Sequence, residues 1–206
     1  MQFLTDPWNW WIVPFAVNSF MRDALVAALL TVLTTSVVGT WVVLRGMSFL
    51  GDALAHGVLP GIAIAFIIGV DTSIGALVAA GAMVLGIAAI RRHSPLPEDT
   101  SIGVLFVGFL ALAVVIMSTQ QASYIGDLNR FLFGSITGVD DADLARQAIA
   151  AAIAVVGVIV LYRALLVMTF DVTLAQMLGL RPGLTQAALL VLVAISIVAS
   201  FQSVGN

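Results

Sequence analysis

Six stretches of this 206-residue chain are long, apolar and almost free of charge, and this feature limits its fold more than any other. A helix needs about 20 mostly apolar residues to cross the hydrocarbon core of a bilayer. The stretches are near that length, are too long for strands and show no apolar–polar alternation. They are Ala24–Leu44, Ala53–Val70, Thr72–Ile90, Thr100–Gly126, Gln147–Met168 and Pro182–Asn206. The sequence therefore predicts an all-α fold, a polytopic transmembrane bundle of about six spans in a single domain over residues 1–206.

The overall composition agrees with a lipid environment. Hydrophobic residues make up 61% of the chain and charged residues only 9%, whereas a soluble domain carries about 25% charged residues. One water-soluble core of this size cannot bury so much apolar surface. Soluble enzymes and nucleic-acid binders are excluded, and membrane lipid is the expected surrounding. Because cysteine is absent, disulfides and thiolate metal sites are excluded as well.

The arginines indicate how the chain crosses the membrane. The Trp-rich segment 1–19 is predicted to lie at the membrane interface, since Trp favours the headgroup level. If the turn after the third span, which follows Arg91 and Arg92, lies inside, five arginines fall on inner loops and three on outer loops. Because arginine is in excess on cytoplasmic loops, this arrangement is favoured, and it places the N-terminus outside. The inner set is Arg45, Arg91, Arg92, Arg163 and Arg181, and the outer set is Arg22, Arg130 and Arg146.

Two ionisable residues open the second span. Asp52 and His56 are four residues apart, so a helix places them on one face. Ionisable groups at membrane depth are costly and usually face a cavity or a partner. A carboxylate and an imidazole in this arrangement can hold one divalent cation, and oxygen and nitrogen donors without thiolate suit Mn²⁺, Zn²⁺ or Fe²⁺. The alternative is that the two side chains only hydrogen-bond to each other or cap a turn.

The same span contains a predicted helix break. Pro60 and Gly61 weaken the backbone hydrogen bonding just beyond His56, and transporters build sites at broken spans. Gly57 and Gly61 also form a small-residue face that predicts close approach of another helix. Two ligands are too few for a divalent metal, so the remaining ligands have to come from another helix, from water or from residues outside this chain.

A short helix is predicted between the fifth and sixth spans, in segment 170–183. Asp171 is a suitable N-cap, and Gly179 with the following Pro182 and Gly183 ends the helix. Leu174, Met177 and Leu178 form an apolar stripe at helical spacing. Such a helix either lies on the membrane surface or docks in a groove of a cytoplasmic partner.

The remaining candidates have simpler interpretations. His93 is expected to be a solvated loop residue, and Asp140, Asp141 and Asp143 a solvated helix start. A further short helix is expected around Asp127–Phe133. No hydrolytic triad and no nucleotide-binding glycine loop occurs in the sequence. The chain is therefore not expected to be an enzyme, and any ATP hydrolysis would belong to another subunit.

On these residues the sequence resembles the membrane permease family of metal-ion ABC importers, the zinc, manganese and iron group. The resemblance covers about Ala24 to the end and rests on blocks that match in order. They are Val42–Gly61, Glu98–Gly103, Arg130–Gly134 and Phe170–Leu180, followed by Ser200–Gly205.

The resemblance implies a type II ABC-importer permease in the cytoplasmic membrane, without a permanently bound cofactor. It implies two cytoplasmic ATP-binding subunits, an extracytoplasmic metal-loading binding protein and a second permease copy. Asp52 and His56 then match the metal pathway, with the divalent metal as transported substrate. The segment from Asp171 through Leu174, Met177 and Leu178 to Gly179 matches the coupling helix.

One departure from the family pattern leads to alternatives. Family members continue beyond the block that contains Gln202, whereas this chain stops at Asn206. We expect either a truncated chain or missing helices supplied elsewhere. The rival hypotheses are a permease for a metal chelate of the siderophore or haem type, and a truncated membrane subunit that does not transport.

Overall fold

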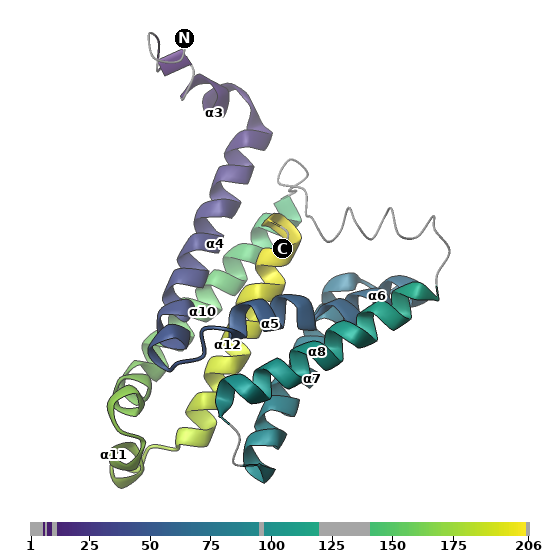
Figure 1. The fold of residues 1–206 in the computed structure, drawn as a ribbon. Coiled ribbons are helices and arrows are strands. Elements are labelled where there is room, and N and C mark those ends of the chain that lie inside the picture. The colour runs from purple at the N-terminus through teal and green to yellow at the C-terminus, as the bar shows by residue number, and fades with distance from the viewer. Residues whose placement is uncertain (1–5, 7, 10–11, 95–96, 120–140, 205–206) are drawn as a thin grey trace.

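The computed structural model describes all residues except 1–5, 7, 10–11, 95–96, 120–140 and 205–206 (Figure 1). Regular structure within the described residues is entirely helical, which confirms the all-α prediction. The helices are α3 (Val13–Val17), α4 (Ser19–Leu44), α5 (Leu50–Gly57), α6 (Leu59–Ile68), α7 (Thr72–His93), α8 (Glu98–Ser118), α10 (Asp141–Phe170), α11 (Val172–Met177) and α12 (Pro182–Val204).

Six helical segments in the described part are long and apolar enough to cross a membrane, which confirms the predicted number of spans. They are Ser19–Leu44, Leu50–Ile68, Thr72–His93, Asp99–Ser118, Asp141–Phe170 and Pro182–Phe201.

Several helix ends differ from the predicted ones. The first span begins at Ser19 and not at Ala24, and the fifth begins at Asp141 and not at Gln147. The prediction stopped each span at a charged residue, but a helix continues through charged residues whose side chains reach the headgroup region. The fourth span, helix α8, ends at Ser118. The rest of the predicted span to Gly126 extends into residues 120–140, which the structure does not describe.

The helices form two groups that meet at α12. In the first group α4, α10 and α12 pack against one another, and in the second α6 packs on both α7 and α8 (Figure 1). Helix α12 also packs on α7 and α5, so it joins the groups. The short α11 lies at the lower end of the bundle, and α12 runs from there to the upper end, where the C-terminus lies (Figure 1).

The second and sixth spans lie deepest in the bundle. In each of them 56% of the most apolar 18-residue window is buried, against 17% for α8. Fully buried side chains from both spans, among them Leu50, Leu54 and Leu189, belong to the central hydrophobic cluster. The span that carries Asp52 and His56 is therefore central to the fold, while α8 lies at its edge.

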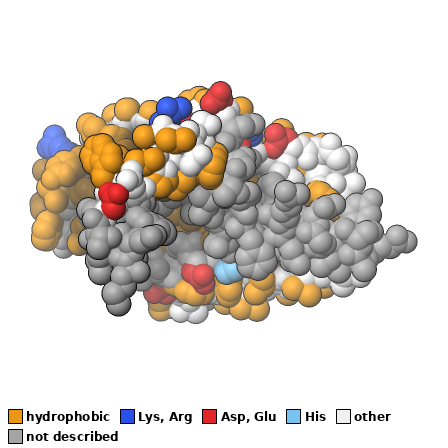
Figure 2. Space-filling view, turned by 90° about the horizontal axis from the view of Figure 1, so that it is seen from above, with side chains coloured by type: hydrophobic (Ala, Val, Ile, Leu, Met, Phe, Trp, Pro, Cys, Tyr) orange, Lys and Arg blue, Asp and Glu red, His pale blue; other side chains and the backbone are white. Residues whose placement is uncertain are grey.

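The exterior is apolar, as expected for a protein in lipid. Hydrophobic side chains cover much of the periphery, and charged ones are few (Figure 2). Large apolar residues are more than half exposed on all the long helices, for instance Val32, Leu85, Val107, Val160 and Leu184. A soluble protein rarely exposes such extensive apolar surface.

The N-terminal segment projects from the bundle. Helix α3 and the first turns of α4 lie beyond the other helices at the upper end (Figure 1). Its interfacial position stays a prediction, as does the outer location of the N-terminus. Trp10, Trp11 and the short helix predicted around Asp127–Phe133 lie outside the described residues.

Candidate functional site

Asp52 and His56 lie on the less buried face of α5. The opposite face of α5 is buried through Leu50, Leu54 and the small residues between and after them. The His56 Nε2 and Asp52 Oδ1 atoms are 3.6 Å apart. The Asp52 side chain is 59% exposed and that of His56 35% exposed, so a cation can reach both donors. We call these two residues the Asp52–His56 pair.

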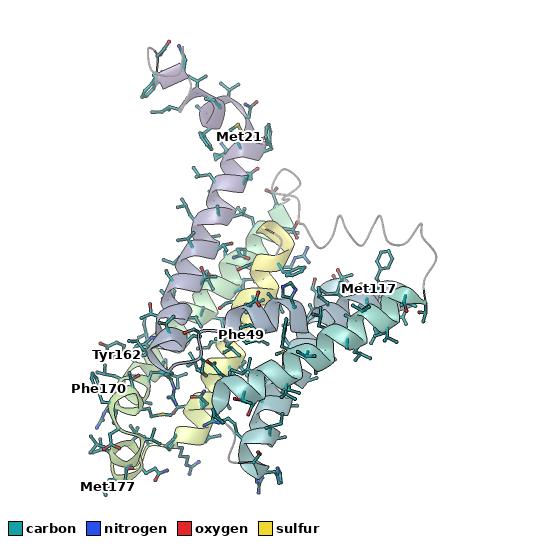
Figure 3. All side chains as sticks on the ribbon, in the orientation of Figure 1. Met21, Phe49, Met117, Tyr162, Phe170 and Met177 are labelled. Atoms are coloured by element: carbon teal, nitrogen blue, oxygen red, sulfur yellow. The ribbon has the colours of Figure 1, made fainter. Side chains whose placement is uncertain are left out.

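An aromatic ring from a neighbouring helix lies beside this pair. Phe106 of α8 makes an edge-to-face contact with Phe49, with ring centroids 5.3 Å apart. The ring of Phe106 also lies 5.9 Å from the imidazole of His56. Phe106 therefore packs beside the imidazole, while Phe49 lies beside α5 (Figure 3). Phe106 was missed in the sequence analysis because one aromatic residue in an apolar span carries no distinguishing signal.

The pair could supply two ligands to a metal ion. Among the described residues no group of three or more histidine, cysteine, aspartate or glutamate side chains could hold a metal ion. A divalent metal generally takes four or more ligands. Asp52 and His56 can therefore form part of a coordination shell, and water or another chain has to complete it.

The second span is interrupted next to the pair. Helix α5 ends at Gly57, Val58 is a turn residue, and α6 begins at Leu59 with Pro60 in its first turn. Val58 keeps helical dihedrals, with φ −81° and ψ −16°, and its N–H donates to the Leu54 carbonyl at 3.1 Å, so the change in the span is local. A functional break at Pro60 and Gly61 stays a prediction. Proline suits this place because the first residues of a helix have no intrahelical acceptor for their N–H groups.

The predicted close approach at the small residues is confirmed. A Cβ atom at Gly61 would clash with the carbonyl oxygen of Gly75 in α7, and one at Gly57 would clash with the sulfur of Met83. These contacts hold α5 and α6 tightly against α7, so the second span is firmly positioned near the Asp52–His56 pair.

Helix α11 forms where the short helix was predicted, but its bounds are Val172–Met177. Asp171 is its N-cap, and its carboxylate accepts hydrogen bonds from the backbone N–H groups of Thr173 at 2.7 Å and Leu174 at 3.1 Å. Gly179 has a φ of +75°, and the Leu180 N–H donates to the Ala175 carbonyl at 3.0 Å. This pattern is the Schellman motif that commonly ends helices at glycine.

The apolar stripe on α11 is exposed. Leu174 is 46%, Leu178 49% and Met177 79% exposed. Met177 and the neighbouring Phe170 lie at the lower end of the molecule, away from the central helices (Figure 3). An exposed apolar surface on a capped helix is suited to contact with another protein or with the membrane surface.

The other ionisable candidates are located at helix ends. His93 is exposed at the end of α7, and its Nδ1 atom lies 2.9 Å from the Ala89 carbonyl oxygen. Asp141 and Asp143 open α10, and Asp143 pairs with Arg146 at 2.9 Å. These positions agree with the expected solvated roles, while Asp140 lies outside the described residues.

The fold and the site together define a class of protein. The chain is a multi-pass helical membrane protein whose central span carries a carboxylate–imidazole pair, and a short exposed helix connects its last two spans. It belongs to the ABC 3 transport family, which it matches over residues 17–206.

Its relatives include named transport proteins. The chain is 37% identical over 187 residues to the manganese import system permease protein ScaB of Streptococcus parasanguinis, covering 91% of this chain and 66% of the relative. It is 32% identical over 197 residues to a probable iron transport system membrane protein of Haemophilus influenzae, covering 96% and 72%. An uncharacterized membrane protein of Cyanophora paradoxa is 40% identical over 194 residues, covering 94% and 64%.

A solved structure has the same fold. PsaBC from Streptococcus pneumoniae, in complex with Fab, matches with a TM-score of 0.78 and 34% identity, over 94% of this chain and 69% of that chain. The chain spans about two thirds of the length of the curated relatives it matches.

Proposed function

We propose that this chain is the membrane permease subunit of an ATP-binding cassette importer for a divalent metal ion, located in the cytoplasmic membrane. The names of its relatives support manganese as the first candidate substrate, with iron as a further candidate. Zinc is a candidate only because oxygen and nitrogen donors also suit it. The proposal depends mainly on one observation, the Asp52–His56 pair on the less buried face of the α5 helix in the central span.

In this proposal the pair replaces part of the hydration shell of the passing metal. The Asp52 side chain supplies an oxygen donor and the His56 imidazole a nitrogen donor, a combination that suits first-row divalent metals. The exposure of both side chains leaves room for water or for a second copy of the permease to add ligands. Because the pair supplies only part of the coordination shell, we expect it to hold the metal weakly enough to release it.

The ATP-binding partner is proposed to contact α11. Leu174, Met177 and Leu178 offer an exposed apolar surface of the kind that fits a groove on another protein. Closure of the ATP-binding subunits would move α11 and switch the bundle between outward and inward access. An extracytoplasmic metal-binding protein would deliver the metal at the opposite end.

Metal uptake by the complete transporter tests the proposal. Asp52→Ala and His56→Ala should each abolish most uptake of Mn²⁺, while Asp141→Ala, which removes an exposed carboxylate at the start of α10, should leave it intact. Uptake is normalised to the amount of permease in the membrane. Unchanged uptake in both variants at the pair would refute its role. If only chelated metal is taken up, the substrate is a metal chelate and not the free ion.

A further inference from the structure

A buried amide joins the start of α12 to the turn between α4 and α5. The Gln186 Nε2 group donates a hydrogen bond to the Met47 sulfur at 3.0 Å. Met47 is completely buried and Gln186 is 3% exposed, although the two are 139 residues apart in sequence. A buried polar side chain in an apolar bundle is costly unless it is hydrogen-bonded, so the contact with Met47 helps to hold Gln186 in place.

Met47 belongs to the segment that positions the Asp52–His56 pair. Helix α4 ends in a Schellman motif, in which Gly46 has a φ of +72° and the Met47 N–H donates to the Val42 carbonyl at 3.0 Å. The Met47 carbonyl accepts a hydrogen bond at 3.0 Å from the N–H of Leu50, the first residue of α5. Asp52 follows two residues later, so a shift of Met47 displaces the start of the helix that carries the pair.

Gln186 belongs to the segment that follows α11. It lies in the second turn of α12, and only four residues separate Met177 at the end of α11 from Pro182. Backbone hydrogen bonds fix the two ends of this connection: the Leu180 N–H donates to the Ala175 carbonyl at 3.0 Å, and the Thr185 N–H donates to the Arg181 carbonyl at 3.1 Å. Because the connection is this short, a displacement of α11 would be passed to the first turns of α12.

We infer that Gln186 is a positioning residue that transmits movement of α11 to Met47 and thereby to the Asp52–His56 pair. The inference rests on the proposed function, because it links the surface proposed to meet the ATP-binding subunit with the residues proposed to meet the metal. A hydrogen bond suits this role because breaking it in a buried site costs free energy, which favours movement of the two segments together.

The test compares metal transport with ATP hydrolysis in the complete transporter reconstituted in liposomes. Gln186→Leu keeps the size of the side chain and removes the donor. The amount of Mn²⁺ carried per ATP hydrolysed should fall at least about fivefold, the lower end of ordinary coupling effects, while hydrolysis itself continues.

The chain offers a matched control. Gln147 is also a buried glutamine, 1% exposed, and its Nε2 group donates to the Thr31 hydroxyl at 2.9 Å between α10 and α4. Gln147→Leu makes the same chemical change away from α5 and α11, so the transport ratio should stay at the wild-type value. An equal fall in both variants would overturn the inference, since it would indicate a general effect of losing a buried amide.

The acceptor provides a second variant. Met47→Leu removes the sulfur, and the fall in the double variant with Gln186→Leu should be smaller than the sum of the two single falls, because both changes remove the same contact. Additive losses, or an unchanged ratio in Gln186→Leu, would overturn the inference. If Gln186→Leu does not assemble, Met47→Leu alone decides by the same ratio. Uptake by the wild type and by Asp52→Ala is measured in parallel. If the wild type transports Mn²⁺, Asp52→Ala does not, and the ratio in Gln186→Leu is unaltered, only this inference is contradicted. If the wild type does not transport Mn²⁺, the proposed function is contradicted too.

Discussion

Gly61 of α6 and Gly75 of α7 lie backbone against backbone, so that a Cβ atom on either one would meet the carbonyl oxygen of the other. Such an approach is possible only where both residues lack a side chain. In lipid, helices gain little from hydrophobic burial against one another, and close packing of this kind supplies the association energy instead. The contact thus fixes the second span, which carries the Asp52–His56 pair, against α7.

The first prediction concerns this contact. In Gly75→Ala the added methyl group would meet the Gly61 carbonyl and the Ala65 side chain, so we expect a loss of about 1–3 kcal/mol in stability. Gly81→Ala in the same helix meets nothing within 4 Å and should gain about 0.5–1 kcal/mol through helix propensity. Thermal unfolding of the purified variants in detergent measures both. A shift of the same sign in the two variants would contradict the packing argument.

A second prediction concerns the pH dependence of stability. Asp71 is the N-cap of α7, and hydrogen bonds from the hydroxyl and the backbone N–H of Ser73 lower the pKa of its carboxyl from the ordinary value of 3.8, with Arg146 adding a smaller effect. A lowered pKa in the folded state means that the ionised carboxylate stabilises the fold. That contribution is complete above the unfolded-state pKa and is lost as the pH falls through the lower folded-state value.

Thermal melts of wild type and Asp71→Asn across pH measure this contribution. Asparagine keeps an acceptor at the N-cap but does not titrate, so the difference between the two melting temperatures should be constant near neutral pH and shrink below pH 3.8. Asp71→Ala, which also removes the cap, should cost about 0.5–2 kcal/mol. A difference that does not change with pH would show that ionisation of Asp71 is irrelevant to stability.

The third prediction concerns the surface of α11. Met177→Ala and Leu174→Ala should each weaken binding of the ATP-binding subunit roughly tenfold, equal to about 1.4 kcal/mol. Because both side chains are exposed, the melting temperature of the permease should barely change. Val160→Ala, a similar truncation at a 74% exposed site on α10, serves as control and should bind normally. Equal binding by all three variants would exclude α11 as the docking helix.

Much of the fold could be predicted from the sequence because the bilayer imposes a simple requirement. Six apolar stretches of sufficient length give six spans, and Asp171 and Gly179 mark the ends of a short helix through well-known capping chemistry. The shared face of Asp52 and His56 also follows from helical spacing alone. Exact helix ends were less predictable, because charged residues such as Arg22 continue a helix without entering the hydrocarbon.

The tertiary details could not be predicted from the sequence. The exposure of Asp52 depends on which helices cover α5, and the aromatic contact of Phe106 depends on how α8 packs beside it. The bond between Gln186 and Met47 joins residues 139 positions apart, which no local pattern indicates. The boundary between α5 and α6 lies at Val58, whereas composition predicted a helix break at Pro60 and Gly61.

The central claim is that Asp52 and His56 bind the transported metal, and Mn²⁺ binding to the purified protein tests it most directly. The sharp electron paramagnetic resonance signal of hydrated Mn²⁺ diminishes on binding, so its intensity measures the free ion. We predict saturable binding by the wild type and at least tenfold weaker binding, about 1.4 kcal/mol, in both Asp52→Asn and His56→Gln, with Asp141→Asn unchanged. Equal affinity in the wild type and the two variants at the pair would contradict the account.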